Sequence, residues 1–179
     1  LKSQLRENGF SSVYMDFNIY LYNRMEDCHE LWWGDEHPCW LDLDLLIEDY
    51  GTKLKEPTFS FAKDVLKHNP KWIGITQFST TSQAPSILLI KAFKELGYKG
   101  KFVLGGPSCM LFHSETPIIK MVDHVIYGEA EESLIELLKG KTSGPGIDTK
   151  NFKQLQNLDK YPFPDYTDLS LKEYSSNGS

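Results

Sequence analysis

The stretch Lys101-Phe-Val-Leu-Gly-Gly-Pro-Ser108 is typical of a buried strand that ends in a glycine pair. A second apolar run, 72–78, leads into the polar loop Ser79-Thr-Thr-Ser-Gln83. The 26 residues from 79 to 104 leave room for one loop, one helix and one new strand. This spacing predicts a βαβ unit with parallel strands. Because ligands of open parallel sheets bind outside the carboxyl ends of the strands, the two loops also predict where a ligand binds.

Strands and helices alternate along most of the chain. Strands are expected near 13–16, 72–77, 101–105 and 123–127, and helices near 1–7, 59–68, 85–96, 117–121 and 129–138. Two further short helices are expected within 19–57. The pattern predicts an α/β fold with a doubly wound parallel sheet of the flavodoxin-like (Rossmann-like) kind. Such a sheet opens with a strand and this chain opens with a helix, so we expect the first strand to be missing and the sequence to begin inside a longer protein.

Composition and charge argue against several classes of protein. The 179 residues suit one domain with an appendage. The net charge of -6 argues against a nucleic-acid partner, which needs clustered Lys and Arg. The longest apolar run, 87–90, is too short to span a bilayer and no leader opens the chain, so a cytoplasmic location is expected. No C-x-x-C pair is formed, which predicts reduced thiols at Cys28, Cys39 and Cys109.

Three motifs resemble a known family. Thr76-Gln-Phe78 followed by Gly105-Gly106 is similar to the S-x-L…G-G signature of cobalamin-binding domains, with Thr for Ser and Phe for Leu. The glycine pair and the block Asp123-His-Val-Ile-Tyr-Gly-Glu-Ala-Glu-Glu-Ser-Leu134 closely resemble the N-terminal domain of cobalamin-dependent radical S-adenosylmethionine enzymes. Leu158-Asp-Lys-Tyr-Pro-Phe-Pro-Asp165 resembles the connector that leads into the radical barrel of that family.

The resemblance implies a domain organisation and a function. Residues 1–147 would form a cobalamin-binding-like domain with a helical insertion at 19–57, and 148–179 would form a linker toward an absent radical S-adenosylmethionine barrel. The domain would bind and orient cobalamin for methyl transfer or related radical chemistry in the full-length enzyme. S-adenosylmethionine and the [4Fe-4S] cluster would bind only the full-length protein, because this chain has no C-x-x-x-C-x-x-C motif. The fragment alone would not be catalytic.

Candidate cofactor contacts lie at the carboxyl ends of the expected strands. Glycines at 105 and 106 let the backbone approach the nucleotide tail of the cofactor without a Cβ in the way. Valine at Gly106 is therefore expected to block the tail while leaving the sheet folded. Short hydroxyls at 76, 79 and 108 can bind amide, ribose and phosphate groups. The cofactor-binding prediction comprises Thr76, Phe78, Ser79, Gly105, Gly106, Pro107, Ser108, Tyr127, Gly128 and Glu129, with no catalytic or metal-ligating residue.

Several alternatives stay open at this point. Glu129 can border the ligand or simply favour the start of the helix that follows it. Asp27-Cys-His29 matches half of a D-x-H-x-x-G motif that supplies a cobalt ligand. Because it follows the second expected strand, we interpret the match as chance and expect base-off cobalamin without a protein histidine. The tryptophan-rich stretch 32–40 is core, a lid, or a face against the barrel. The alternative functions are a degenerate ligand-free docking or substrate-shaping domain and a flavodoxin-like domain for another phosphate-bearing ligand.

Overall fold

A three-stranded parallel sheet lies at the centre of the described part of the chain. The computed structural model describes residues 1–25, 43–49, 53–152, 154–169 and 171–174. The strands run in the order β1 (Trp72–Thr76), β2 (Lys101–Gly105) and β3 (His124–Val125). Their register places Thr76 beside Gly105, so β1 and β2 end together. The prediction of β2 is confirmed, whereas β3 is shorter than the expected 123–127.

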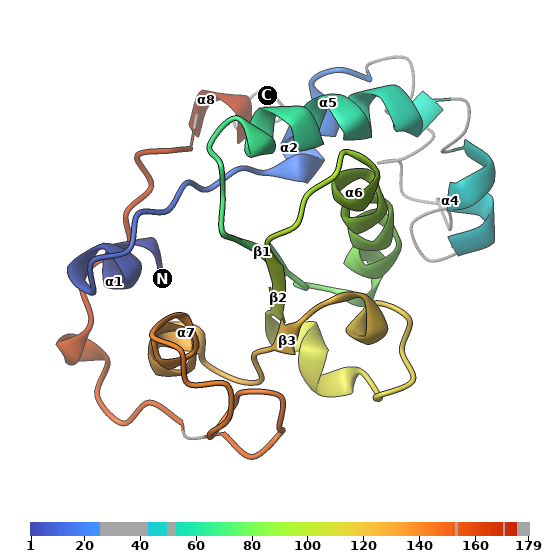
Figure 1. Ribbon diagram of the computed structural model, residues 1–179. Helices are drawn as coiled ribbons and strands as arrows, with labels where there is room; N and C mark the ends of the chain where they lie inside the picture. Colours follow the sequence, from blue (N-terminus) through green and yellow to red (C-terminus); the bar gives the residue numbers. More distant parts are fainter. Residues whose placement is uncertain (26–42, 50–52, 153, 170, 175–179) are drawn as a thin grey trace.

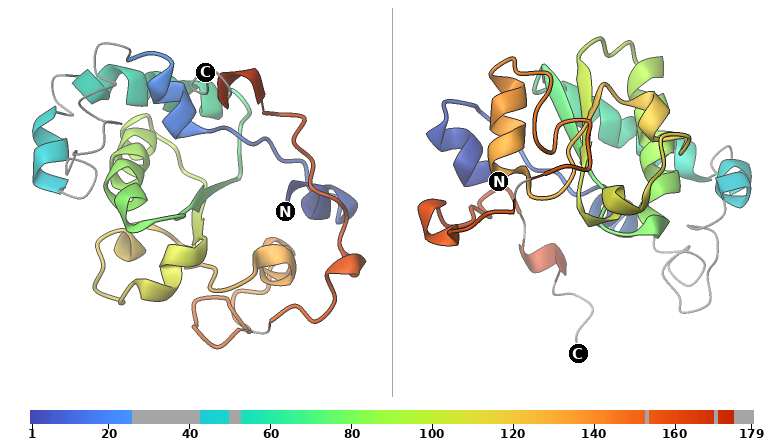
Figure 2. Two further views of the ribbon diagram at one scale, coloured as in Figure 1. Left: turned by 180° about the vertical axis from the view of Figure 1, so that it is seen from behind. Right: turned by 90° about the horizontal axis from the view of Figure 1, so that it is seen from below.

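Helices cover both faces of this sheet, as Figures 1 and 2 show. On one face, α5 (Lys55–Leu66) and α6 (Gln83–Glu95) enclose the larger core, which includes Phe61, Ile90, Phe93, Phe102 and Leu104. On the other face, α7 (Ala130–Leu138) and α1 (Lys2–Glu7) pack over Val103 and Ile126, using Leu134, Leu137 and Leu5. Apolar residues on both sides of β2 are typical of a parallel strand buried by helices. The α/β class predicted from the alternation is confirmed.

The remaining described elements are short. They are the helices α2 (Phe17–Tyr22), α4 (Leu43–Asp49) and α8 (Leu171–Tyr174), and the 3-10 turns η4 (Thr80–Ser82), η5 (Pro107–Leu111), η6 (Ile119–Met121) and η7 (Leu158–Lys160). Helix α4 lies within the expected helical insertion 19–57. The motif at 27–29 and the tryptophan-rich stretch 32–40 lie outside the described residues. Within the described residues, no helix is long and apolar enough to cross a bilayer.

The strand expected at 13–16 is absent, so this prediction is wrong. The segment is not in the sheet, and Val13 and Tyr14 are 54% and 48% exposed. The Asp16 carboxylate instead accepts a hydrogen bond from the Ile19 amide, at 3.0 Å, and so caps the start of α2. A β-branched and aromatic run becomes a strand only when a neighbouring strand pairs with it. Here the helix cap at Asp16 decides the local structure.

The two edges of the sheet differ. The outer edge of β3 is covered by 146–148, where the Tyr127 amide donates to the Gly146 carbonyl and the Asp148 amide donates to the Val125 carbonyl, both at 2.8 Å. At β1, the Gln77 amide donates a hydrogen bond to the Gly105 carbonyl. The backbone N–H and C=O groups of the odd-numbered residues of this strand therefore point toward β2. The backbone groups of residues 72, 74 and 76 therefore point to the other edge, where no described residue bonds to them.

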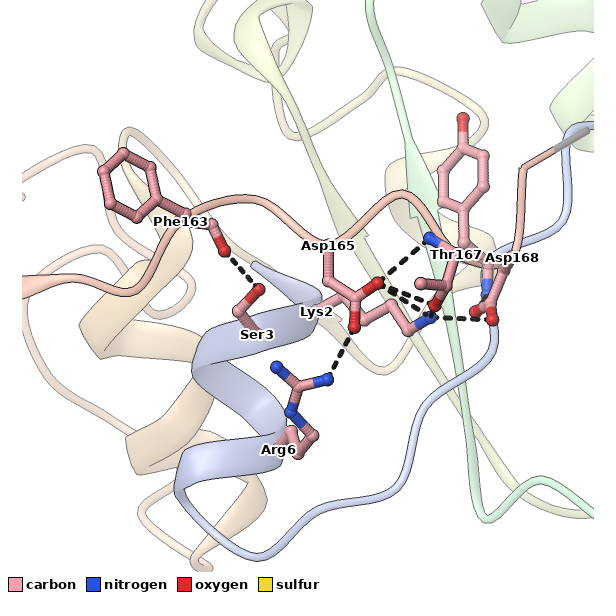
Figure 3. A network of polar contacts seen from close by, with 8 residues as sticks. Lys2, Ser3, Arg6, Phe163, Asp165, Thr167 and Asp168 are labelled. Atoms are coloured by element: carbon pink, nitrogen blue, oxygen red, sulfur yellow. Dashed lines mark hydrogen bonds and ion pairs between the residues drawn. The ribbon is translucent and has the colours of Figure 1, made fainter. Parts of the chain in front are cut away.

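The C-terminal segment docks on α1, as Figure 3 shows. Residues 162–166 form neither helix nor strand, and the Phe163 carbonyl accepts a hydrogen bond from the Ser3 hydroxyl. The Asp165 carboxylate pairs with Arg6 at 2.7 Å, and Lys2 contacts Asp168 at 2.7 Å. These contacts join residues that are about 160 positions apart in the sequence. The expected linker is therefore held against the domain over this stretch.

We expect the docking of this segment to weaken in acid. Hydrogen bonds from Thr167, assisted by Lys2 and Arg6, lower the pKa of Asp165 to about 2 from 3.8. A carboxyl with a lowered pKa in the folded state stabilises that state above its ordinary pKa, and the effect disappears as pH falls through the lowered value. The Thr167 amide, which donates to Asp165, should therefore shift in NMR spectra with a midpoint near 2. A midpoint near pH 4 would contradict the lowered pKa of Asp165. The same change of the Thr167 amide shift in Asp165→Asn would show that another group titrates.

Thr58 of α5 is a position where a substitution is expected to stabilise the folded state. Its side chain is 1% exposed, and its hydroxyl has no hydrogen-bond partner among the described residues. A buried polar group without a partner loses its water and gains nothing in exchange. We expect Thr58→Val, which keeps the shape, to raise the free energy of unfolding by about 1 kcal/mol. Urea denaturation measures this change, and an unchanged or lower midpoint would show that the hydroxyl has a partner.

Candidate functional site

Gln77 joins the two loops that follow β1 and β2. Its side chain is fully buried, with 0% exposure. Its backbone amide donates to the Gly105 carbonyl at 2.7 Å, and its carbonyl accepts from the Ser108 amide at 3.1 Å. Its side-chain amide donates to the Ser86 hydroxyl of α6 at 2.7 Å. The loops after both strands are therefore held as one unit, in a way that the sequence analysis did not anticipate.

Position 106 requires glycine because the backbone of Gln77 packs directly against it. Its φ of 106° and ψ of 166° fall in a region that only glycine adopts readily. A Cβ at this position would lie 2.6 Å from the Gln77 carbonyl oxygen and 2.9 Å from the Gln77 nitrogen. The space next to Gly106 is thus filled by the backbone of the protein itself. Valine at Gly106 is therefore expected to strain the contact between the two loops, so it would not test the approach of a ligand alone.

Gly105 is different. A Cβ there would meet only Ile126, at 3.9 Å, which is an ordinary van der Waals contact. Thr76, its neighbour in the register, is exposed, and so is Gly74 two residues earlier on the same face of β1. The carboxyl ends of β1 and β2 therefore present bare backbone and one hydroxyl. Gly74 was not singled out in the sequence, although a glycine inside a strand is a signal of close backbone approach.

The loop residues beside this face have two kinds of role. Phe78 is 80% exposed, and Pro107 is exposed as well. The Ser79 hydroxyl is half-buried and hydrogen-bonds with Thr81. Ser108 is buried, and its hydroxyl donates to the Phe78 carbonyl at 3.1 Å. Ser108 thus holds the two loops together, whereas the Phe78 ring is exposed.

The candidate residues after β3 are engaged within the protein. Tyr127 is buried, and the Phe152 ring lies on the side of Gly128 where a Cβ would point. The Glu129 carboxylate accepts a hydrogen bond from the Leu155 amide, at 2.6 Å. Glu129 precedes α7 without capping it through its side chain, and the carboxylates of the first turn are those of 131 and 132. Phe152 and Leu155 therefore lie against the residues that follow β3.

The structure thus divides the ten candidate residues into two groups. The first group is accessible or half-buried at the ends of β1 and β2 and comprises Thr76, Phe78, Ser79, Gly105 and Pro107. The second group makes internal contacts and comprises Gly106, Ser108, Tyr127, Gly128 and Glu129. The accessible group offers backbone, hydroxyl and aromatic contacts, which suit binding of a large ligand.

Lys150 is a further residue near the carboxyl ends of the strands. Its ammonium donates to the Met110 carbonyl of η5 at 2.7 Å and lies 5.9 Å from the centre of the Tyr127 ring. It therefore bridges the segments that follow β2 and β3. No local sequence pattern indicates this position, and Lys150 lies in the segment 148–179 that is expected to be a linker.

Two titratable groups near the site, Cys109 and Tyr127, have raised pKa values. Burial raises the pKa of the Cys109 thiol to about 11, and burial also raises the pKa of the Tyr127 phenol. Neither group is a ready nucleophile or base near pH 7. Within the described residues, no group of three or more His, Cys, Asp and Glu side chains is placed to hold a metal ion.

Comparison with known proteins gives no relative from which a function could be carried over. No family model, no curated protein and no solved structure matches the chain.

Proposed function

We propose that this chain is the cobalamin-binding domain of a radical S-adenosylmethionine enzyme, with a flavodoxin-like doubly wound fold. The observation that carries the proposal is the half-buried Gly105, where a Cβ would make only ordinary contact with Ile126, beside the exposed Thr76 at the carboxyl end of a parallel sheet. Ligands of such sheets bind at this end. The motifs around the glycine pair and at 123–134 supply the resemblance that favours cobalamin over other ligands.

The accessible residues fit such a ligand. A nucleotide tail can lie against Gly105, because the place of a side chain there is free. Hydroxyls of Thr76 and Ser79 can bind amides and ribose, and the exposed Phe78 ring can pack against an apolar surface. When bound, cobalamin would supply the cobalt that carries a methyl group for transfer in the full-length enzyme. The residues of this chain bind the cofactor and fix its orientation.

The proposal includes a base-off cofactor. If Gly105 held the nucleotide tail, the dimethylbenzimidazole would be kept away from the cobalt. The positional argument against His29 no longer holds, because residues 13–16 form no strand, and His29 itself lies outside the described residues. An electron paramagnetic resonance spectrum of the bound cob(II)alamin form without nitrogen splitting is expected. Splitting that disappears in His29→Ala would identify a histidine ligand instead.

Equilibrium dialysis with hydroxocobalamin tests the proposal directly. We expect saturable binding of one corrinoid per chain. Dialysis that shows no saturable binding would contradict the proposal and favour the second candidate, a ligand-free docking or substrate-shaping domain. One observation supports that second candidate, since Phe152 and Leu155 already contact Gly128 and Glu129 after β3.

A further inference from the structure

We propose that Lys150 binds the phosphate of the ligand's nucleotide tail. The inference rests on the proposed function and names the contact that recognises the anionic group of the ligand. Its starting point is the position of the ammonium at the carboxyl edge of the sheet, between the carbonyl of Met110 and the ring of Tyr127. A phosphodiester is the charged group that the tail of a cobalamin would bring to this edge.

The charge of Lys150 is not neutralised within the described residues. Four other lysines pair with carboxylates, namely Lys2, Lys67, Lys120 and Lys141. Lys150 instead uses one donor on a neutral carbonyl, which leaves two of its three N–H groups for a ligand. A hydrogen bond from an ammonium to a phosphate oxygen is stronger than one to a neutral acceptor. The phosphate would therefore gain a partner that the protein has left available.

The backbone around Lys150 is held in place. The Asp148 amide donates to the Val125 carbonyl at 2.8 Å, and the Asn151 carbonyl accepts from the Gly146 amide at 2.9 Å. The Phe152 ring packs on Gly128. These contacts fix the segment on both sides of Lys150 against β3 and its carboxyl end. Because the ammonium is already positioned, little conformational entropy is lost when an anion binds.

Lys94 provides a matched comparison. Its ammonium donates to the Met121 carbonyl at 2.9 Å and lies 5.8 Å from the Phe102 ring, so it makes the same pair of contacts. Phe102 lies near the start of β2, whereas Tyr127 follows β3, and the two lysines thus occupy opposite ends of the sheet. The contacts alone therefore do not mark a binding site. The position at the carboxyl edge distinguishes Lys150.

The experiment compares two corrinoids and two lysine variants. Hydroxocobalamin carries the nucleotide phosphate, and cobinamide lacks it. We expect Lys150→Gln to weaken hydroxocobalamin binding about tenfold, with little change for cobinamide. Lys150→Arg, which keeps the charge, should restore most of the affinity, and Lys94→Gln should change neither affinity. Thermal unfolding followed by circular dichroism checks that the variants are folded.

The possible outcomes separate this inference from the proposed function. Equal weakening of both corrinoids in Lys150→Gln, or weakening of neither, overturns the role of Lys150 and leaves cobalamin binding intact. Equal weakening would mean that Lys150 only ties its segment to η5. A wild-type chain that binds neither corrinoid overturns the proposed function and this inference together. Selective loss of hydroxocobalamin binding, restored by arginine, supports the inference.

Discussion

Replacing Gly106 with alanine is expected to lower the free energy of unfolding by about 3 kcal/mol or more. The substitution forces a side chain into a backbone conformation with φ of 106° and ψ of 166°. It also places a Cβ 2.6 Å from the Gln77 carbonyl oxygen, so the contact that joins the two loops must open. Chemical denaturation in urea, with the midpoint and slope fitted to a two-state transition, measures the loss.

Gly105→Ala is the matched control for this prediction. Its Cβ would make only an ordinary contact with Ile126, at 3.9 Å, and the strand conformation suits any residue. We expect its unfolding free energy to stay within about 1 kcal/mol of the wild type. If the Gly106 variant were as stable as the Gly105 variant, the role assigned to the Gln77 contact would be wrong.

Hydroxocobalamin binding is expected to fall at least about a hundredfold in Gly105→Val, while the sheet stays folded. The larger side chain would occupy the face beside Thr76, where the ligand has to approach the backbone. Such a loss corresponds to about 3 kcal/mol of binding free energy. Valine is favoured in strands, so the substitution is compatible with β2. Isothermal titration calorimetry on both proteins gives the affinities.

Thermal unfolding of Gly105→Val has to accompany the titration. If the variant had wild-type stability and wild-type affinity, the ligand would not bind beside Gly105. If the valine variant is destabilised, Gly105→Ala serves in its place, with a smaller expected loss because only one methyl group enters the face. If Gly105→Ala bound hydroxocobalamin as tightly as the folded wild type, the placement of the ligand beside Gly105 would again be contradicted.

The sequence predicted those parts of the fold that depend on strong local patterns. Strand β2 has a continuous apolar run that ends in glycine, and its bounds agree with the prediction. Helix α6 begins at Gln83, two residues before the expected start at Pro85, and α7 begins one residue after Glu129. These helices have an apolar face that the chain alone reveals. The bounds of these two helices therefore differ from the prediction by one or two residues, whereas α5 begins four residues before the expected 59 and the helix expected at 117–121 is the 3-10 turn η6.

The failures came from contacts between distant residues. Residues 13–16 have strand-like composition, but strand formation needs a partner and Asp16 instead starts a helix. The sequence grouped Gly105 with Gly106, because a pattern cannot show that the Gln77 backbone fills only one of the two spaces. The approach of Phe152 to Gly128 and of Lys150 to Met110 likewise depends on how the chain folds back along β3.

The central claim is that a corrinoid binds at the carboxyl ends of β1 and β2. The most direct test is the change in amide chemical shifts of the ¹⁵N-labelled chain when diamagnetic hydroxocobalamin is added. We predict that the amide shifts change for 76–79 and for 105, 106 and 108, with a weaker effect at 150, and stay constant at the amino ends of the strands near Trp72 and Lys101. Unchanged spectra at saturating ligand, or changes confined to the other end of the sheet, would contradict the account.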